Sequence, residues 1–141
     1  MAGSITLRVI TPDRIVVDVA VSEVKFPALD GSMGVLPRHA AMVAALDAGV
    51  LSWSDSEEQG HMFISGGFAE VRDNTVRVVT EASEPASEID VERAARSAER
   101  ARERLRGGGA DITALDFDKL RAEGALRRAL MRRLTARRAG L

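Results

Sequence analysis

The sequence predicts an α+β protein, mostly β, in which an antiparallel β-sandwich or flattened barrel precedes a hairpin of two helices. Residues 1–86 contain many short stretches where apolar and polar residues alternate with period two, as in half-buried strands. Turns rich in glycine, proline and aspartate separate these stretches, and no long helix intervenes. Beyond residue 86, alanines and arginines recur at helical spacing. We therefore expect a sandwich domain over residues 1–86 and a helical hairpin over residues 87–141.

The expected strands are short and closely spaced. In chain order they are Ile5–Val9, Ile15–Val21, Val24–Phe26, a brief Val35–Pro37, Val50–Trp53, His61–Ile64, Phe68–Val71 and Thr75–Thr80. A glycine-bearing loop is expected over Ala28–Gly34. Asp73-Asn74 is expected to form a tight hairpin turn, because both residues tolerate a positive φ.

The stretch Glu84–Ala94 marks the change from strand to helix. Pro85 cannot donate a backbone hydrogen bond to a sheet. Ser87, with Asp90 three residues later, is a typical helix-start pattern, in which a side-chain oxygen accepts from free backbone amides. This stretch is therefore expected to end the sandwich and to begin the first helix.

The first helix is expected to run to Arg106, with Gly107–Gly109 ending it. Its apolar face carries residues at spacings of four, three and four, namely Ala94, Ala98, Ala101 and Leu105. The second helix is expected to start near Asp111 or Thr113, to end near Arg138 and to show one apolar face, made of Leu126, Leu130 and Leu134. Because a buried alanine methyl contributes about 0.8 kcal/mol against roughly 2 for leucine, the hairpin should be marginal and able to move.

Composition limits the possible functions. The chain has 141 residues, of which 45% are hydrophobic and 29% charged, as in an ordinary folded protein. It has no cysteine and two histidines, so neither a disulfide framework nor a metal site is expected, and His39 is expected to be structural. The longest wholly apolar run, Ala40–Leu46, is far shorter than the roughly 18 to 20 residues that span a bilayer, and no signal-peptide pattern is present.

Charge is unevenly distributed along the chain. Residues 1–86 carry twelve acidic and six basic side chains, whereas residues 87–141 carry nine acidic and fourteen basic ones. The second helix has no acidic residue after Glu123 but six arginines, namely Arg127, Arg128, Arg132, Arg133, Arg137 and Arg138. Nucleic-acid binding fits this pattern poorly, because no aromatic residues for base stacking lie between the arginines.

Three motifs, in order, resemble the ε subunit of bacterial F-type ATP synthases. They are Asp30–Ala40 (DGSMGVLPRHA), Leu46–Gly49 (LDAG) and Ser65–Val71 (SGGFAEV), and a helical hairpin follows them. The resemblance covers nearly the whole chain. It implies a ten-stranded antiparallel β-sandwich with a C-terminal two-helix hairpin, in a non-catalytic rotor subunit that couples proton flow to ATP synthesis.

Two positions depart from the family pattern. Arg38 stands where the family has glycine, so a positive φ there would strain the backbone, whereas at a negative φ Arg38 would simply add a polar contact to a neighbouring subunit. The segment between the helices, Gly107–Lys119, is longer than the family pattern, which leaves the start of the second helix open.

The resemblance also implies partners and a location. One side of the sandwich would bind the γ subunit, and the loop Asp30–Met33 would rest on the ring of c subunits. The arginine-rich second helix would meet the catalytic α and β subunits in an extended, inhibitory state. The chain would then be a peripheral protein at the cytoplasmic face of the inner (plasma) membrane, reaching the membrane only indirectly.

An ATP site is implied at the start of the hairpin. Family members that bind ATP carry an I(L)DxxRA motif, which here reads IDVERA over Ile89–Ala94. The implied cofactor-binding set is Glu84, Ile89, Asp90, Arg93, Ala94, Arg100, Arg128 and Arg132. Guanidinium forks suit bidentate contacts to phosphate, and a carboxylate such as Asp90 or Glu84 would accept from the adenine amino group. The alternative is a solvated helix pair of mixed charge.

ATP would act as a regulatory ligand, with no cofactor required. The hairpin packed on the sandwich would permit rotation, the extended hairpin would obstruct hydrolysis, and ATP would stabilise the packed form. No GxxxxGK[ST] phosphate loop and no clustered histidine and carboxylate set is present, so no catalytic residue is expected. A free-standing nucleotide-sensing adaptor outside any rotary enzyme is the alternative function.

Overall fold

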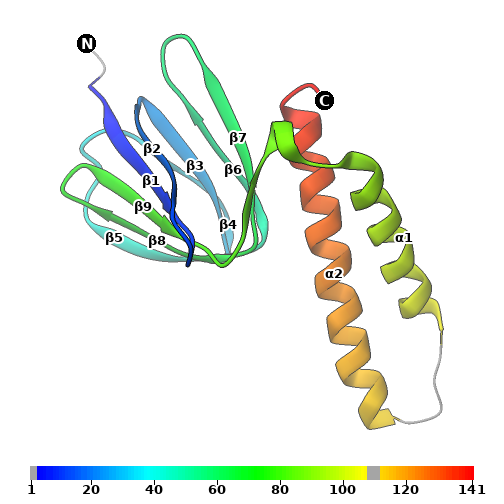
Figure 1. Cartoon of the computed structure of the whole chain (residues 1–141). Helices are drawn as coiled ribbons and strands as arrows, with labels where there is room; N and C mark the ends of the chain where they lie inside the picture. The colour runs from blue at the N-terminus through cyan, green and yellow to red at the C-terminus, as the bar shows by residue number, and fades with distance from the viewer. Residues whose placement is uncertain (1–2, 108–111) are drawn as a thin grey trace.

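The computed structural model describes residues 3–107 and 112–141, with side chains from residue 117 onward in the second range. Its strands are β1 (Ile5–Ile10), β2 (Ile15–Val21), β3 (Glu23–Ala28), β4 (Gly31–Val35), β5 (Met42–Leu46), β6 (Gly49–Ser54), β7 (Gln59–Ile64), β8 (Gly67–Arg72), β9 (Thr75–Val79) and β10 (Ser83–Pro85). A 3-10 helix, η1 (Ala86–Glu88), leads into the helices α1 (Val91–Arg106) and α2 (Ile112–Arg138). The predicted α+β class, with a ten-stranded sandwich followed by two helices, is confirmed (Figure 1).

The strands form one continuous path that folds back on itself. Their order is β10-β7-β6-β3-β5-β8-β9-β1-β2, and β4 pairs with the other edge of β3. Only Ala28 and Leu46 pair across β3 and β5, so the path bends there into two facing layers (Figure 1). The pairs are antiparallel except β1 with β9, whose parallel pairing departs from the predicted all-antiparallel sandwich. Apolar side chains from both layers, among them Leu7, Phe26 and Leu51, are fully buried between them.

Three strands escaped the sequence analysis. The segment Ala28–Gly34, expected to be a loop, instead ends β3 and forms most of β4, with a tight turn between them. Neither β4 (GSMGV) nor β5 (MVAAL) alternates in sequence, since β5 is apolar on its exposed face as well, where Val43 lies. The three-residue β10 is too short to show a period. The pattern of alternation therefore failed where a strand is glycine-rich, apolar on both faces or very short.

The predicted turn at Asp73-Asn74 is confirmed, with φ of 49° and 56°. It joins β8 to β9 through the pair Arg72 and Thr75. The side chain of Asn74 also connects two other segments: its Nδ2 donates to the carbonyl of Ser4 at 2.7 Å, and its Oδ1 accepts from the backbone N–H of Arg38 at 2.8 Å. Arg38 has φ of 64°, so this position has the positive φ that was expected to strain the backbone of a non-glycine residue.

The first helix begins three residues later than Ser87 suggests. Residues 86–88 form η1, and the N-cap of α1 is Asp90, whose carboxylate accepts from the backbone N–H of Arg93 at 2.9 Å. Ser87 makes no cap because the chain is still in the tighter 3-10 turn there, and this part of the prediction is wrong. The helix ends at Arg106 with Gly107 as its C-cap, as predicted; Gly108 and Gly109 lie outside the described residues.

Alanines mediate the packing of α1 against α2. Of the predicted apolar face of α1, Ala94, Ala98 and Ala101 are buried, whereas Leu105 is only half-buried. On α2 the predicted leucine stripe is wrong: Leu126, Leu130 and Leu134 are only half-buried, and the buried residues are Ala122, Ala129, Thr135 and Ala136. Small side chains on both helices allow the backbones to approach closely, and the leucines lie beside the seam. Helix α2 ends at Arg138, as predicted, and Asp111, one of the two proposed starts, lies outside the described residues.

Helix α2 lies between the sandwich and α1 (Figure 1). Its C-terminal half contacts β6, β7 and η1, while the other half extends past the sandwich. A second buried cluster joins Phe63 of β7, Ile89 and Ala136 of α2, with Met131 packed against it. The hairpin and the sandwich therefore share a small apolar contact rather than a large common core.

Candidate functional site

A small cavity lies where the end of the sandwich meets the start of α1 and the C-terminal half of α2. Its volume is about 280 Å³, and its lining residues are Glu84, Glu88, Asp90, Arg93, Ala94, Ser97, Arg100 and Arg132. They come from β10, η1, α1 with its N-cap, and α2. The cavity therefore spans the parts of the chain whose relative positions would change if the hairpin moved.

Asp90 organises the α1 side of the cavity. Its Oδ1 accepts from the N–H of Arg93, which fixes the first turn of α1 and satisfies one of the free amides at the helix N-terminus. Arg93 and Arg100 are seven residues apart, so both side chains leave the same face of α1. The cap thus fixes the backbone turn from which Arg93 leaves, and Arg100 follows on the same face of α1.

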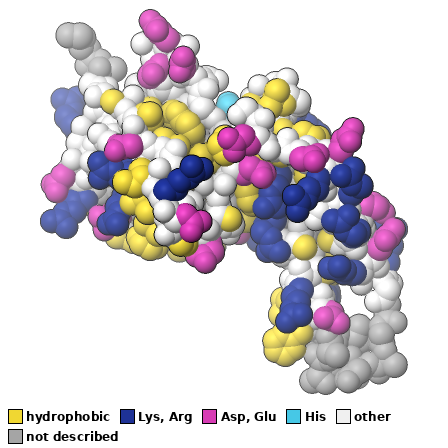
Figure 2. Space-filling model, viewed as in Figure 1, with side chains coloured by type: hydrophobic (Ala, Val, Ile, Leu, Met, Phe, Trp, Pro, Cys, Tyr) yellow, Lys and Arg dark blue, Asp and Glu magenta, His cyan; other side chains and the backbone are white. Residues whose placement is uncertain are grey.

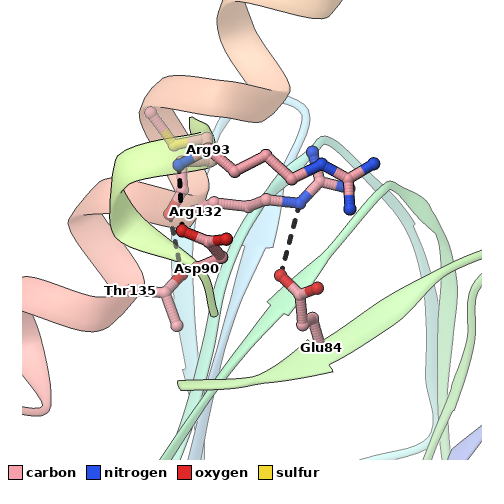
Figure 3. Close-up of polar contacts among 6 residues, drawn as sticks. Glu84, Asp90, Arg93, Arg132 and Thr135 are labelled. Atoms are coloured by element: carbon pink, nitrogen blue, oxygen red, sulfur yellow. Dashed lines mark hydrogen bonds and ion pairs between the residues drawn. The ribbon is translucent and has the colours of Figure 1, made fainter. Parts of the chain in front are cut away.

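Arg132 contributes the α2 side. Its Nε lies 3.5 Å from Oε1 of Glu84, and its guanidinium carbon lies 4.3 Å from the centre of the Phe63 ring. A cation over an aromatic face is attracted by the ring quadrupole, by about 0.5–1 kcal/mol at exposed sites and more when desolvated. Two sandwich residues therefore contact one arginine of α2. Figure 3 shows Arg93 and Arg132 extended in the same direction, with Glu84 below them.

Six of the eight residues proposed from the sequence line the cavity: Glu84, Asp90, Arg93, Ala94, Arg100 and Arg132. Ile89 does not, because its side chain packs in the cluster with Phe63 and Ala136, where it is 8% exposed. Arg128 is exposed on α2 and is not among the lining residues. Ile89 therefore acts as an anchor beneath the site in this conformation.

The sequence analysis missed three residues of the site. Ser97 stands four residues after Arg93 and three before Arg100, so helical spacing alone would have placed it on the same face. Glu88 enters because η1 turns the chain just before the N-cap. Nothing in the sequence marks Phe63, which reaches Arg132 only because β7 lies beside β10.

The cavity is electrostatically balanced. Three arginines (Arg93, Arg100 and Arg132) face three carboxylates (Glu84, Glu88 and Asp90). Arg132 and Glu84 are each about one third exposed, so their pair is screened by water and exchangeable. A ligand with phosphate groups could take the place of the carboxylates as guanidinium partner.

Figure 2 shows Lys and Arg side chains gathered over the helices, whereas charges of both signs are interspersed with apolar residues on the sandwich.

A second ion pair holds α2 further along. Nη2 of Arg127 lies 2.8 Å from Oδ2 of Asp47, in the turn between β5 and β6, and Oδ1 of Asp47 accepts from the N–H of Ala48 at 2.8 Å. Asp47 belongs to the LDAG motif noted in the sequence. Among the residues that the structure describes, no group of three or more His, Asp or Glu side chains is placed to hold a metal ion.

Comparison with known proteins settles the family. Residues 4–86 match the model of the ATP synthase delta/epsilon chain β-sandwich domain, and residues 87–133 match that of the ATP synthase delta/epsilon chain long α-helix domain. The chain belongs to the family of ATP synthase epsilon chains. It is thus a non-catalytic subunit of the F-type ATP synthase, the complex that couples proton transport to ATP synthesis.

Curated relatives are similar over almost their whole length. The ATP synthase epsilon chain of Nitratidesulfovibrio vulgaris (strain DP4) is 42% identical over 132 residues, which are 94% of this chain and 95% of the relative. That of Symbiobacterium thermophilum is 43% identical over 131 residues, covering 92% and 91%. That of Synechococcus elongatus is 42% identical over 129 residues, covering 92% of both.

Solved structures show the same fold. A chain of the Euglena gracilis mitochondrial ATP synthase, in a structure described as OSCP/F1/c-ring, superposes with a TM-score of 0.80 and 26% identity, covering 99% of this chain and 82% of that one. A chain in the central stalk and c-ring structure of the Tetrahymena thermophila mitochondrial enzyme superposes with a TM-score of 0.60 at 15% identity, covering 91% and 95%. In the described part of the chain, neither helix is both long and apolar enough to cross a membrane.

Proposed function

We propose that the chain is a central-stalk rotor subunit whose helical hairpin regulates ATP hydrolysis, with ATP bound in the cavity as the regulatory ligand. The observation that carries this proposal is the meeting of Arg93, Arg100 and Arg132, from both helices, with Glu84 of the sandwich. A ligand bound to all of them would join three elements at once. It would therefore stabilise the docked hairpin relative to the extended one.

The geometry suggests how ATP would enter. The volume of about 280 Å³ is just below that of typical ligand pockets, which is about 300–1,000 Å³. Entry of a nucleotide therefore requires the Arg132 guanidinium to leave Glu84. Phosphate oxygens then replace the carboxylate as its partner, and the freed oxygens of Glu84 accept from the adenine amino group. Asp90 stays with the N–H of Arg93 and keeps α1 in place.

The binding energy of ATP is sufficient to shift the docking equilibrium of a marginally stable hairpin. Hydrogen bonds to charged groups contribute roughly 1.5–3 kcal/mol each, and exposure reduces this. A ligand shifts a conformational equilibrium only by its difference in affinity between the two states. Because the extended hairpin would separate Arg132 from Glu84 and from the start of α1, most of the contacts to ATP would be lost there.

Calorimetric titration of the full chain with ATP tests the nucleotide site. We expect heat of binding at cellular ATP concentrations and at least a tenfold loss of affinity in Arg93→Ala and Arg132→Ala. Arg96→Ala and Arg133→Ala are matched controls, since neither residue lines the cavity. Arg128→Ala should cost less than Arg132→Ala. Absence of binding by the parent chain, or equal losses in the controls, would refute the site.

Exposed apolar residues support the proposed contacts within the synthase. On the pair β5 and β8, Val43 and Phe68 are both exposed, as expected of a surface that the γ subunit covers. Leu29, 65% exposed, stands at the turn before Asp30–Met33, the segment proposed to rest on the c-ring. Phe117 and Leu120 are exposed near the far end of α2, where the extended hairpin would meet the catalytic subunits. The chain would then lie peripherally at the cytoplasmic face of the inner membrane.

Co-purification tests this assembly. A tagged chain should bring down γ and the c-ring, and Val43→Glu should reduce γ recovery by at least tenfold while Thr75→Glu, on β9, should not. Recovery of a free monomer in every case would favour the adaptor outside a rotary enzyme. Family membership favours the synthase subunit.

A further inference from the structure

A larger cleft lies at the other end of the contact between α2 and the sandwich. Its volume is about 620 Å³, and it is lined mainly by apolar residues of β2, β6, β7, β10 and η1, together with Arg138 at the end of α2 and Ala139 and Leu141 beyond it. His61 of β7 lines it too. The cleft is separate from the cavity at Arg93 and shares no lining residue with it.

His61 is poorly suited to carry a proton in this position. Its Nδ1 is shielded from solvent and has no hydrogen-bond partner in the described structure. A neutral imidazole can leave that nitrogen unprotonated, whereas an imidazolium carries an N–H on both nitrogens. Protonation would therefore create a buried donor without an acceptor, which is costly.

The charges around the ring act in the same direction. The sandwich and η1 contribute only uncharged residues to the cleft besides His61, and the one other charged side chain among the lining residues is Arg138 of α2. Glu84, beside the cleft on β10, pairs with Arg132. Burial first, and Arg138 second, lower the pKa of His61 below its ordinary value of about 6.5, and no carboxylate offsets them.

We propose that protonation of His61 releases the C-terminal end of α2 from the sandwich, so that docking of the hairpin is a pH-sensitive switch at a site distinct from the nucleotide cavity. Release moves Arg138 away from the ring and removes the residues after it from the cleft, which lowers the cost of the imidazolium. The proposal rests on the hairpin being mobile, as in the proposed function, but not on nucleotide binding.

The sign of the pH dependence follows from linkage. The docked state has the lower pKa, so the undocked state binds more protons once the pH falls below about 6.5. Docking is therefore strongest above that value and weakens as the pH falls towards the docked pKa. Because one proton is involved, the ratio of docked to undocked chains changes by at most about tenfold per pH unit.

Distances between two spin labels on the full chain, without nucleotide, test this. The chain has no cysteine, so Ser56→Cys in the loop between β6 and β7 and Glu123→Cys on α2 provide unique label sites. The docked fraction should fall between pH 7.5 and 5.5. His61→Gln should remove this fall, whereas His39→Gln, which changes the other histidine, should preserve it.

Arg138→Ala provides an independent variant if His61→Gln docks poorly. It should move the midpoint of release by raising the pKa of His61, measured from its imidazole proton resonance, whereas Arg137→Ala should not. A docked fraction independent of pH, or the same pH dependence in His61→Gln, would overturn the proposal. Adding ATP at pH 8, where His61 is neutral, reports on the proposed nucleotide response separately.

Discussion

At the scale of single residues, Arg38 shows how a left-handed backbone conformation is tolerated at a residue other than glycine. Its φ of 64° lies in the left-handed region, which costs a non-glycine residue roughly 1–2 kcal/mol. The hydrogen bond from its N–H to Oδ1 of Asn74 holds the conformation, and it does so through the backbone. The side chain itself is exposed, so the guanidinium is not needed for the fold.

We expect Arg38→Gly to stabilise the chain by up to about 1 kcal/mol, because glycine adopts this φ without steric cost and keeps the N–H to Asn74. Arg38→Val should destabilise it by about 1–2 kcal/mol, since a β-branched residue is strongly disfavoured at positive φ. Urea unfolding monitored at Trp53 measures both. Equal stability of the glycine and valine variants would show that the backbone relaxes here.

Local chemistry at this scale was largely readable from the sequence. Asp73 and Asn74 predicted their own turn because both are residues that accept a positive φ. Phe63 gave no such signal, since its contact with Arg132 depends on the pairing of β7 with β10 and on where α2 docks. A residue's partners across elements follow from topology, which local patterns do not contain.

At the scale of elements, the two helices meet through alanine. Ala122 and Ala129, one heptad apart on α2, are buried like the alanines of α1, and a seam of such small side chains tolerates little added volume. The sequence analysis assigned the leucines to the buried face because leucine is more hydrophobic than alanine. Burial depends instead on which residues let the two backbones approach each other. The alanines on the buried face of α1 were therefore predicted correctly, whereas on α2 the sequence analysis chose the leucines and missed the alanines.

Ala98→Leu tests this seam. Ala98 is fully buried, so three added carbons must displace α2, and we expect a loss of about 1–3 kcal/mol in hairpin stability. Ala95→Leu, three residues away on the same helix and only half-buried, should be nearly neutral. The loss of helical circular dichroism on heating measures both variants. Equal destabilisation of the two would contradict a tight alanine seam.

At the scale of the whole molecule, the hairpin is attached to the sandwich by a few separate contacts. These are the cluster of Phe63, Ile89 and Ala136, the Arg132 contacts to Glu84 and Phe63, and the ion pair between Arg127 and Asp47. Each is small and several are exposed. If the hairpin docks and releases as proposed, we expect contacts of this size to let ATP at the Arg93 cavity and a proton at His61 shift the docking equilibrium.

The ion pair between Asp47 and Arg127 allows the balance to be shifted without touching either proposed ligand site. Asp47→Asn removes the charge but keeps an oxygen that can accept from the N–H of Ala48. Because Arg127 is 61% exposed, the pair should contribute no more than about 1 kcal/mol, so the ratio of docked to undocked chains should fall by up to about fivefold. The effect should shrink at high salt, since exposed charges are screened.

The distances between the two spin labels measure the docked fraction, with Arg133→Ala as control. The reversed pair, Asp47→Arg with Arg127→Asp, should restore docking. If reversal restores nothing, Asp47 acts through the turn it stabilises rather than through Arg127.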